Sequence, residues 1–144
     1  MFTAILALLL QPALGHASPF AHHFGTYKVI ALRDSINGKE SDRSGSTGKI
    51  KIYERPADAD SSRAIVYYFE GKKGSWSGGG PILPSSWSGA PIQCLEKADY
   101  IGCTSAEKTL TTTMVTLSDG RIVLSVFSAG PDFFTKGVWE LRRL

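Results

Sequence analysis

The residues that could support catalysis are few, and their positions do not suit it. The chain has only three histidines, His16, His22 and His23, all of them near its beginning. A Ser-His-Asp triad or a multi-histidine metal site needs an imidazole held beside the other reacting groups. We therefore expect no catalytic residue, no bound metal and no cofactor.

Two short stretches contain the residue types of functional loops, but not in the required order. Residues 43–50 read RSGSTGKI, with Arg43 where a phosphate-binding loop has its first glycine and Ile50 where it has the metal-binding hydroxyl. Residues 74–78 read GSWSG, and Trp76 stands where a nucleophile elbow has serine. We interpret both stretches as polar connections.

The charge of the chain excludes an electrostatic nucleic-acid site. The net charge is only +3, and Lys and Arg are interspersed with acidic residues rather than gathered in a stripe. Glu70 and Glu140 adjoin aromatic strands and could act as acid and base only if they converged in one cleft. We interpret both as surface residues in ion pairs, and so predict that the protein is not an enzyme.

The first residues read as an export signal. An uncharged apolar run at positions 2–10 is followed by a break at Pro12 and by small residues at Gly15 and Ala17. This pattern predicts a signal peptide over residues 1–17, with residues 18–144 as a single secreted or periplasmic domain. The apolar run is shorter than the roughly 20 residues that span a bilayer. The alternative is a buried core helix.

The two cysteines, Cys94 and Cys103, are most simply a disulfide in an exported chain. If the apolar start were not an export signal, they would be free thiols.

The remaining chain is a series of strand patterns separated by Gly, Asp, Ser and Pro. Residues 49–53, KIKIY, alternate strictly and predict a half-buried strand, whereas residues 63–69, RAIVYYF, are apolar on both faces and predict a deeply covered one. In the last strand, Trp139 and Leu141 should point to one side. Strands are expected at residues 27–33, 49–53, 63–69, 110–117, 121–127 and 137–143, with two short ones around the cysteines.

Ser118, Asp119 and Gly120 predict a tight hairpin, because a type I′ turn needs positive φ at both central residues and Asp-Gly supplies them. Sequential strands with short connections predict an all-β fold, a single small antiparallel up-and-down barrel of about seven or eight strands. A β-sandwich with Greek-key crossings is the alternative.

The sequence also resembles a known family. FGTYKV at residues 24–29, followed by a β meander that ends in VWELRRL, is similar to the lipocalin-like (calycin-type) superfamily of small secreted barrels. In that family a Gly-x-Trp packs against a late basic residue at the closed end. The resemblance implies that Tyr27, standing in place of the Trp, packs there against Arg142 or Arg143 through a cation–π contact. Compact barrel inhibitors exported by bacteria are similar in the same features.

The segment at residues 72–91 contains Trp76 and Trp87 among Gly, Pro and Ser, and predicts a long irregular loop. Three interpretations are open: a plug on the protein's own core, a lid over a ligand site in the barrel mouth, or a patch that docks a partner protein. Phe133 and Phe134 are expected in the loop before the last strand, at the same end of the barrel.

We therefore expect Trp76, Trp87, Phe133 and Phe134 to contact a small apolar ligand held by a non-enzymatic carrier. The alternative function is a protein-binding inhibitor or surface-interaction module that uses the same loops. The expected partners are a small apolar molecule or a protein, with no nucleic acid and no membrane span.

Overall fold

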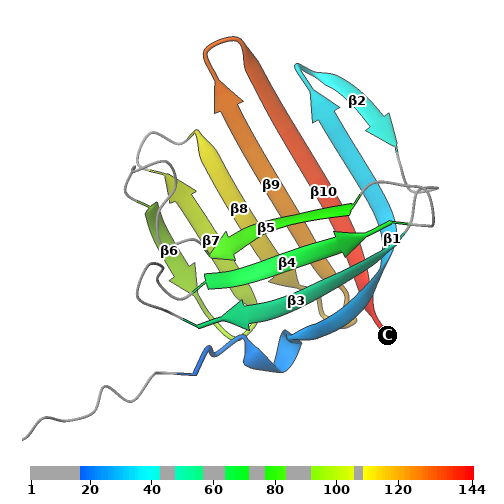
Figure 1. Ribbon diagram of the computed structural model, residues 1–144, viewed down its shortest axis with the longest axis vertical. Helices are drawn as coiled ribbons and strands as arrows, with labels where there is room; N and C mark the ends of the chain where they lie inside the picture. The colour runs from blue at the N-terminus through cyan, green and yellow to red at the C-terminus, as the bar shows by residue number, and fades with distance from the viewer. Residues whose placement is uncertain (1–16, 43–47, 57–63, 72–76, 84–91, 106–108) are drawn as a thin grey trace, which may run out of the picture.

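The computed structural model describes residues 17–42, 48–56, 64–71, 77–83, 92–105 and 109–144, and within them the fold is all-β, as predicted (Figure 1). These residues form ten strands rather than seven or eight, because β2 and β5 arise where the sequence pattern predicts loops. None of the described residues lies in a helix long and apolar enough to cross a membrane. In chain order the elements are the 3-10 helix η1 (Ala21–His23), β1 (Gly25–Ile36), β2 (Lys39–Asp42), β3 (Lys49–Arg55), β4 (Ala64–Glu70), β5 (Ser77–Leu83), β6 (Ile92–Glu96), β7 (Tyr100–Ser105), β8 (Leu110–Thr116), β9 (Ile122–Gly130) and β10 (Phe133–Arg143).

All ten strands belong to one antiparallel sheet that curls into a half-barrel. The strand order is β5-β4-β3-β1-β10-β9-β8-β7-β6, with β2 also paired to β1. β1 pairs with β3 and with β10, and the consecutive strands β2–β3 and β5–β6 do not pair. Every other pair joins strands that follow one another in the chain, so the largely up-and-down arrangement is confirmed. The predicted closure of the barrel is not confirmed. β5 and β6 are the two ends of the described sheet, and β5 lies over β7 and β8 instead of pairing with β6.

The curl originates in β1, which takes part in both halves of the sheet. Residues 25–28 pair with β3, whereas residues 33–36 pair with β2 on the same edge. Between these two stretches the register with β10 shifts at Val29 and Ala31, which marks a β-bulge. A bulge bends its strand and increases its twist. As a result β3, β4 and β5 turn away from β2 and cross the lower part of the longer strands (Figure 1).

β1 and β2 form a tight hairpin that the sequence analysis did not predict. Its turn is Asn37-Gly38, and both residues have positive φ, 50° and 81°. This is the conformation of a type I′ turn, for which Asn-Gly is a strong sequence signal.

The β8–β9 hairpin is confirmed, but its turn is not type I′. Only Gly120 has positive φ, at 78°, and its N–H donates to the carbonyl of Leu117. Because the Leu117 N–H also donates to the carbonyl of Arg121, the connection has three residues. The geometry corresponds to a turn followed by a left-handed glycine, the usual solution for hairpin loops of this length.

β5 corrects the prediction of a long irregular loop over residues 72–91. Its sequence is SGGGPIL, and it pairs with β4 along its length. A Cβ at Gly79 would lie only 2.3 Å from the carbonyl oxygen of Tyr67, so glycine permits the close approach of the two strands. Ile82 is fully buried. The low strand propensity of glycine is thus overridden by pairing and by burial of the strand's apolar end.

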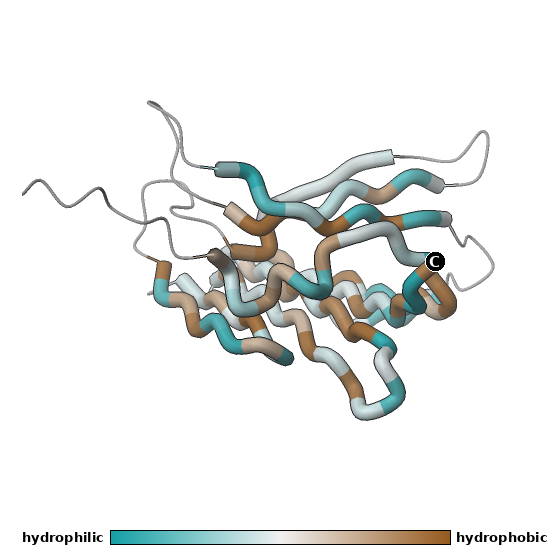
Figure 2. The backbone as a smooth tube through the Cα atoms, turned by 90° about the horizontal axis from the view of Figure 1, so that it is seen from below, coloured by the Kyte–Doolittle hydropathy of each residue, from teal (hydrophilic) through white to brown (hydrophobic). Residues whose placement is uncertain are grey.

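Side chains alternate between the two faces of each strand, and the buried residues lie on the inner face. Figure 2 shows hydrophobic and hydrophilic positions following one another along the strands. In β3 the isoleucines are buried and the lysines exposed, as predicted. β4 is not covered on both faces, because Tyr68 is 46% exposed while Phe69 is buried. In β10, Trp139 and Leu141 are the buried residues, also as predicted. The core consists of Phe20, Tyr27, Val29, Leu32, Ile50, Ile52, Ile65, Phe69, Ile82, Ile101, Met114, Ile122, Leu124, Trp139 and Leu141.

The predicted disulfide joins Cys94 and Cys103, which are directly opposite each other on β6 and β7. It ties the edge strand β6 to the rest of the sheet.

Candidate ligand-binding face

The concave face of the half-barrel is only partly filled by the core. Its inward positions on β10 are the odd-numbered residues from Phe133 to Leu141, since Trp139 and Leu141 are buried. Residues in register on the neighbouring strands share that face. Beyond Trp139 the inward side chains become partly or largely exposed, with Ile36 at 56% and Phe133 at 49%. We call this part of the concave face the trough; its residues are Asp34, Ile36, Val126, Ser128, Phe133, Thr135, Gly137 and Trp139.

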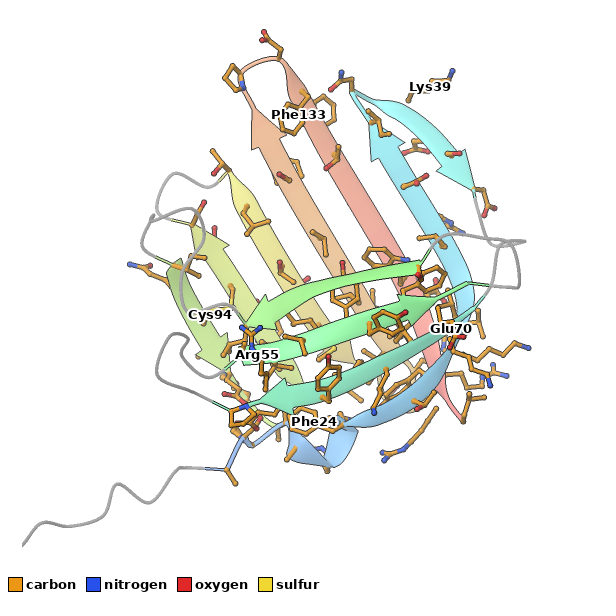
Figure 3. All side chains as sticks on the ribbon, viewed as in Figure 1. Phe24, Lys39, Arg55, Glu70, Cys94 and Phe133 are labelled. Atoms are coloured by element: carbon orange, nitrogen blue, oxygen red, sulfur yellow. A yellow bond between two sulfur atoms is a disulfide. The ribbon has the colours of Figure 1, made fainter. Side chains whose placement is uncertain are left out.

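The trough is long enough to accommodate a small molecule. It runs along β10 from Phe133 to Trp139, and at roughly 3.4 Å per residue this is about 20 Å. Four of its residues are apolar, Asp34 is charged, and Ser128 and Thr135 carry hydroxyl groups opposite each other. Figure 3 shows Phe133 near the far end of the long strands, well away from β5. An apolar concavity with a few polar groups is the usual form of a ligand site.

Trp139 closes the lower end of the trough and joins the two layers of the sheet. Its ring packs against Tyr67 of β4, with centroids 5.7 Å apart and planes tilted by 47°. Its six-membered ring also lies over Gly137, where a Cβ would be 3.4 Å away. Burial raises the pKa of the Tyr67 phenol above its ordinary value.

The indole nitrogen of Trp139 is a buried donor without an acceptor. Trp139 is 9% exposed, and within the described structure its Nε1 has no hydrogen-bond partner. Buried indole N–H groups normally find a partner, and an unmade bond costs about 1–3 kcal/mol.

Asp34 is a diagonal cross-strand neighbour of Trp139. Asp34 is directly opposite Gly137 in the β1–β10 pair, and Leu32 is opposite Trp139. Diagonal neighbours on one face of an antiparallel pair have Cα atoms roughly 7–8 Å apart. Asp34 is partly buried and, by register, lies on the same face as Trp139.

The structure separates the two phenylalanines that the sequence analysis placed together. Phe133 and Phe134 are the first residues of β10 and not loop residues. Because successive side chains of a strand point to opposite faces, only Phe133 lies in the trough, and Phe134 lies on the convex face. Trp76 and Trp87, the other two predicted contact residues, lie outside the described residues.

Of the two arginines predicted at the closed end, Arg143 is the one opposite the buried Tyr27 on β10, and Arg142 is opposite Lys28; both arginines are exposed. The cation–π contact itself stays a prediction. Arg143 donates hydrogen bonds to the carbonyls of His22 and Phe24. It therefore holds η1 against the lower end of the half-barrel.

The histidines near the chain start are not at a frayed end. His22 and His23 form η1, with ring centroids 3.9 Å apart, and His23 Nε2 is 3.1 Å from Thr116 Oγ1. Burial, and then the neighbouring His22, lower the pKa of His23. In the described part of the chain, no group of three or more His, Cys, Asp or Glu side chains could hold a metal ion.

The two candidate acid and base residues do not share a cleft. Glu70 lies on β4 opposite Lys49 and is exposed, on the convex face. Glu140 lies on the convex face of β10 and forms an ion pair with Arg121 at 2.9 Å. In the sheet order β3 and β1 separate their strands.

Sequence reasoning missed the lower end of the trough. Alternation identified Trp139 as an inward residue, but nothing local shows that its N–H lacks an acceptor. Tyr67 belongs to a strand that the sequence analysis interpreted as covered on both faces, so its side chain was not singled out. The Asn37-Gly38 turn did have a sequence signal, which was overlooked.

No protein-family model matches the chain, and comparisons with curated proteins and with solved structures return no match.

Proposed function

We propose that the protein is an exported, non-enzymatic carrier that binds a small, mainly apolar molecule in the trough. The observation that carries this proposal is the uncovered stretch of the concave face, where Ile36 and Phe133 are half exposed beside the buried core. Large exposed apolar side chains on a concave surface gain free energy when a ligand covers them.

Two further features support the proposal. The curled antiparallel half-barrel is compatible with a lipocalin-like fold, in which the concave interior is the ligand site. The Cys94–Cys103 disulfide fits an exported protein. A lid formed by Trp76 and Trp87 remains a prediction.

The test is a fluorescence titration with aminoanthracene, an apolar dye that brightens when it leaves water. The wild type should bind the dye with one-to-one stoichiometry. Phe133→Ser should weaken binding at least about fivefold, because it removes an apolar wall of the trough. Phe134→Ser is the matched control, since it makes the same change one residue along on the convex face, and should bind like the wild type.

Equal affinity in both variants would place the dye elsewhere and contradict the proposal. The wild-type sample used for the titration must also show a cooperative unfolding transition. This control is needed because partly unfolded chains would take up the dye as well.

A second candidate function is recognition of another protein by the far end of the half-barrel. There the β1–β2 and β9–β10 hairpin ends are joined by two hydrogen bonds between Asn37 and Phe134, at 2.8 and 2.9 Å. Ile36, Phe133 and Phe134 are all exposed around them. A rigid end with exposed aromatic side chains suits a protein partner. In that case Phe134→Ser would weaken partner binding as much as Phe133→Ser.

A further inference from the structure

We infer that the mature chain begins at Ser18 and that its new α-ammonium group forms an ion pair with Glu96, which ties the chain start to the edge strand β6. This inference rests on the export part of the proposed function and concerns a site outside the trough.

The expected cleavage site lies where the chain start becomes part of the fold. Ala17 is exposed, whereas Ser18 is only 5% exposed and Phe20 is fully buried in the core. Figure 1 shows the described chain start, in blue, at the lower end of the half-barrel. A peptidase has to reach both sides of the bond that it hydrolyses, so the Ala17–Ser18 bond is cut before this end of the protein folds.

Ser18 is held in place by its own polar groups. Its hydroxyl donates a hydrogen bond to Glu96 Oε1, and the same oxygen accepts a hydrogen bond from the Phe20 N–H at 3.1 Å. The Ser18 carbonyl accepts a hydrogen bond from the Ala21 N–H at 3.0 Å. None of these three bonds uses the Ser18 nitrogen, so all of them persist when the bond before Ser18 is cut.

Cleavage creates a positive charge beside Glu96. A signal peptidase adds water across the Ala17–Ser18 bond, which leaves a carboxylate on Ala17 and an ammonium group on Ser18. The nitrogen and the hydroxyl of one serine are three bonds apart, so the ammonium group lies within about 6 Å of the carboxylate that this hydroxyl contacts. A charge at a nearly buried position is costly unless it is paired, and an opposite charge at this distance stabilises it.

The position of Glu96 gives the ion pair a structural role. Glu96 is the last residue of β6, is partly buried, and lies directly opposite the buried Ile101. Within the described sheet β6 pairs only with β7. The disulfide fixes this edge strand at Cys94, and the ion pair fixes its end. The other charged or titratable side chains where η1 meets the β6–β7 turn are His22, His23, Lys97, Asp99 and Arg143.

The first measurement is the intact mass of the chain that an exporting host secretes when it expresses residues 1–144. We expect the mass of residues 18–144. The second measurement follows the Ser18 Cα resonance of this mature chain by NMR as the pH changes. An α-amino group ordinarily has a pKa of roughly 7.7–8.0. The ion pair should raise this pKa by about one unit, whereas burial without a partner would lower it.

Variants then test the partner. Glu96→Gln keeps an acceptor for the Ser18 hydroxyl but removes the charge, and should return the pKa of the amine to its ordinary value or below. Glu40→Gln makes the same change at an exposed position on β2 and should leave the pKa raised.

A chain with one glycine added before Ser18 carries its ammonium group one residue further out. Its melting temperature should be roughly 3 °C lower, the shift that about one pKa unit of interaction produces in a domain of this size. In the Glu96→Gln background the added glycine should cause no further decrease.

The outcomes separate the levels of the inference. If the secreted chain is not shortened, the export on which the inference rests is wrong. If it is shortened but starts at another residue, the cleavage site is wrong. If it starts at Ser18 but the pKa of its amine is not raised, or is raised equally in Glu96→Gln, the ion pair is wrong. Dye binding in the trough tests the carrier function separately, and the titration of the wild type holds even if Glu96→Gln fails to fold.

Discussion

The turn between β1 and β2 offers a quantitative test of how the far end of the half-barrel is held. Asn37 has φ of 50°, and its Oδ1 accepts a hydrogen bond from the Phe134 N–H at 2.8 Å. Its own N–H donates to the Phe134 carbonyl at 2.9 Å. One residue thus supplies a left-handed conformation and a side-chain acceptor, and three substitutions separate these contributions.

Asn37→Ala removes both contributions. The left-handed conformation costs an ordinary L-residue such as Ala about 1–2 kcal/mol, a cost that Asn reduces because its side chain hydrogen-bonds locally, and the lost hydrogen bond to Phe134 costs about 0.5–1.5 kcal/mol. Because the turn is exposed, we expect the two costs together to lower the free energy of unfolding by about 2 kcal/mol, which is near the lower end of their combined range. Asn37→Gly keeps the conformation and loses only the side-chain bond, so we expect about 1 kcal/mol. Asn37→Asp keeps an acceptor and tolerates positive φ, and we expect less than about 0.5 kcal/mol.

The assay is urea unfolding followed by circular dichroism, with the disulfide intact. Glycine makes the unfolded chain more flexible, which narrows the difference between the alanine and glycine variants but does not reverse it. Two results would refute the reasoning: an alanine variant no less stable than the glycine variant, or an aspartate variant as unstable as the alanine one.

Three further predictions concern other parts of the molecule. Reducing Cys94–Cys103, which are nine residues apart, should lower the free energy of unfolding by about 2.7 kcal/mol in urea titrations; the Cys94→Ser, Cys103→Ser double variant should not respond to the reductant. Gly79→Ala should destabilise by about 1–3 kcal/mol, because its Cβ would meet the Tyr67 carbonyl at 2.3 Å, whereas Gly80→Ala makes an ordinary ring contact at 3.5 Å and should cost less; equal thermal shifts for the two would contradict this. Because the pKa of His23 is lowered in the folded state, the unfolded chain binds more protons, so stability should fall as pH drops below about 6.5. Between about pH 7.5 and about pH 5.5, the free energy of unfolding should fall less for His23→Gln than for the wild type. Equal decreases would show that His23 is not responsible for the pH dependence.

Much of the local structure could be predicted because strand alternation and turn chemistry are properties of neighbouring residues. The isoleucines of residues 49–53 and the Trp139–Leu141 pair face inward as their spacing predicts. The Cys94–Cys103 bond was predicted from the number of cysteines together with the expected export of the chain, and the structure contains it. The β8–β9 hairpin was found from Asp119-Gly120, although its turn type was not.

Predictions failed where a distant segment decides the outcome. Residues 77–83 are poor strand formers, yet they form β5 because β4 offers a hydrogen-bonding edge and the core accepts Ile82. Whether β4 is covered on one face or on both depends on whether another segment of the chain packs against its outer face. The sequence of β4 alone does not indicate this.

The sequence by itself determined the all-β class, the sequential meander, the inward face of the last strand and the disulfide, because these depend on short-range periodicity and on chain chemistry. Only the tertiary structure decided that the sheet remains open between β5 and β6, that Phe133 and Phe134 point to opposite faces, and that the Trp139 N–H is buried without an acceptor. These features depend on how β1 bends at its bulge and on which strands then lie opposite one another, and such long-range contacts leave no local mark in the sequence.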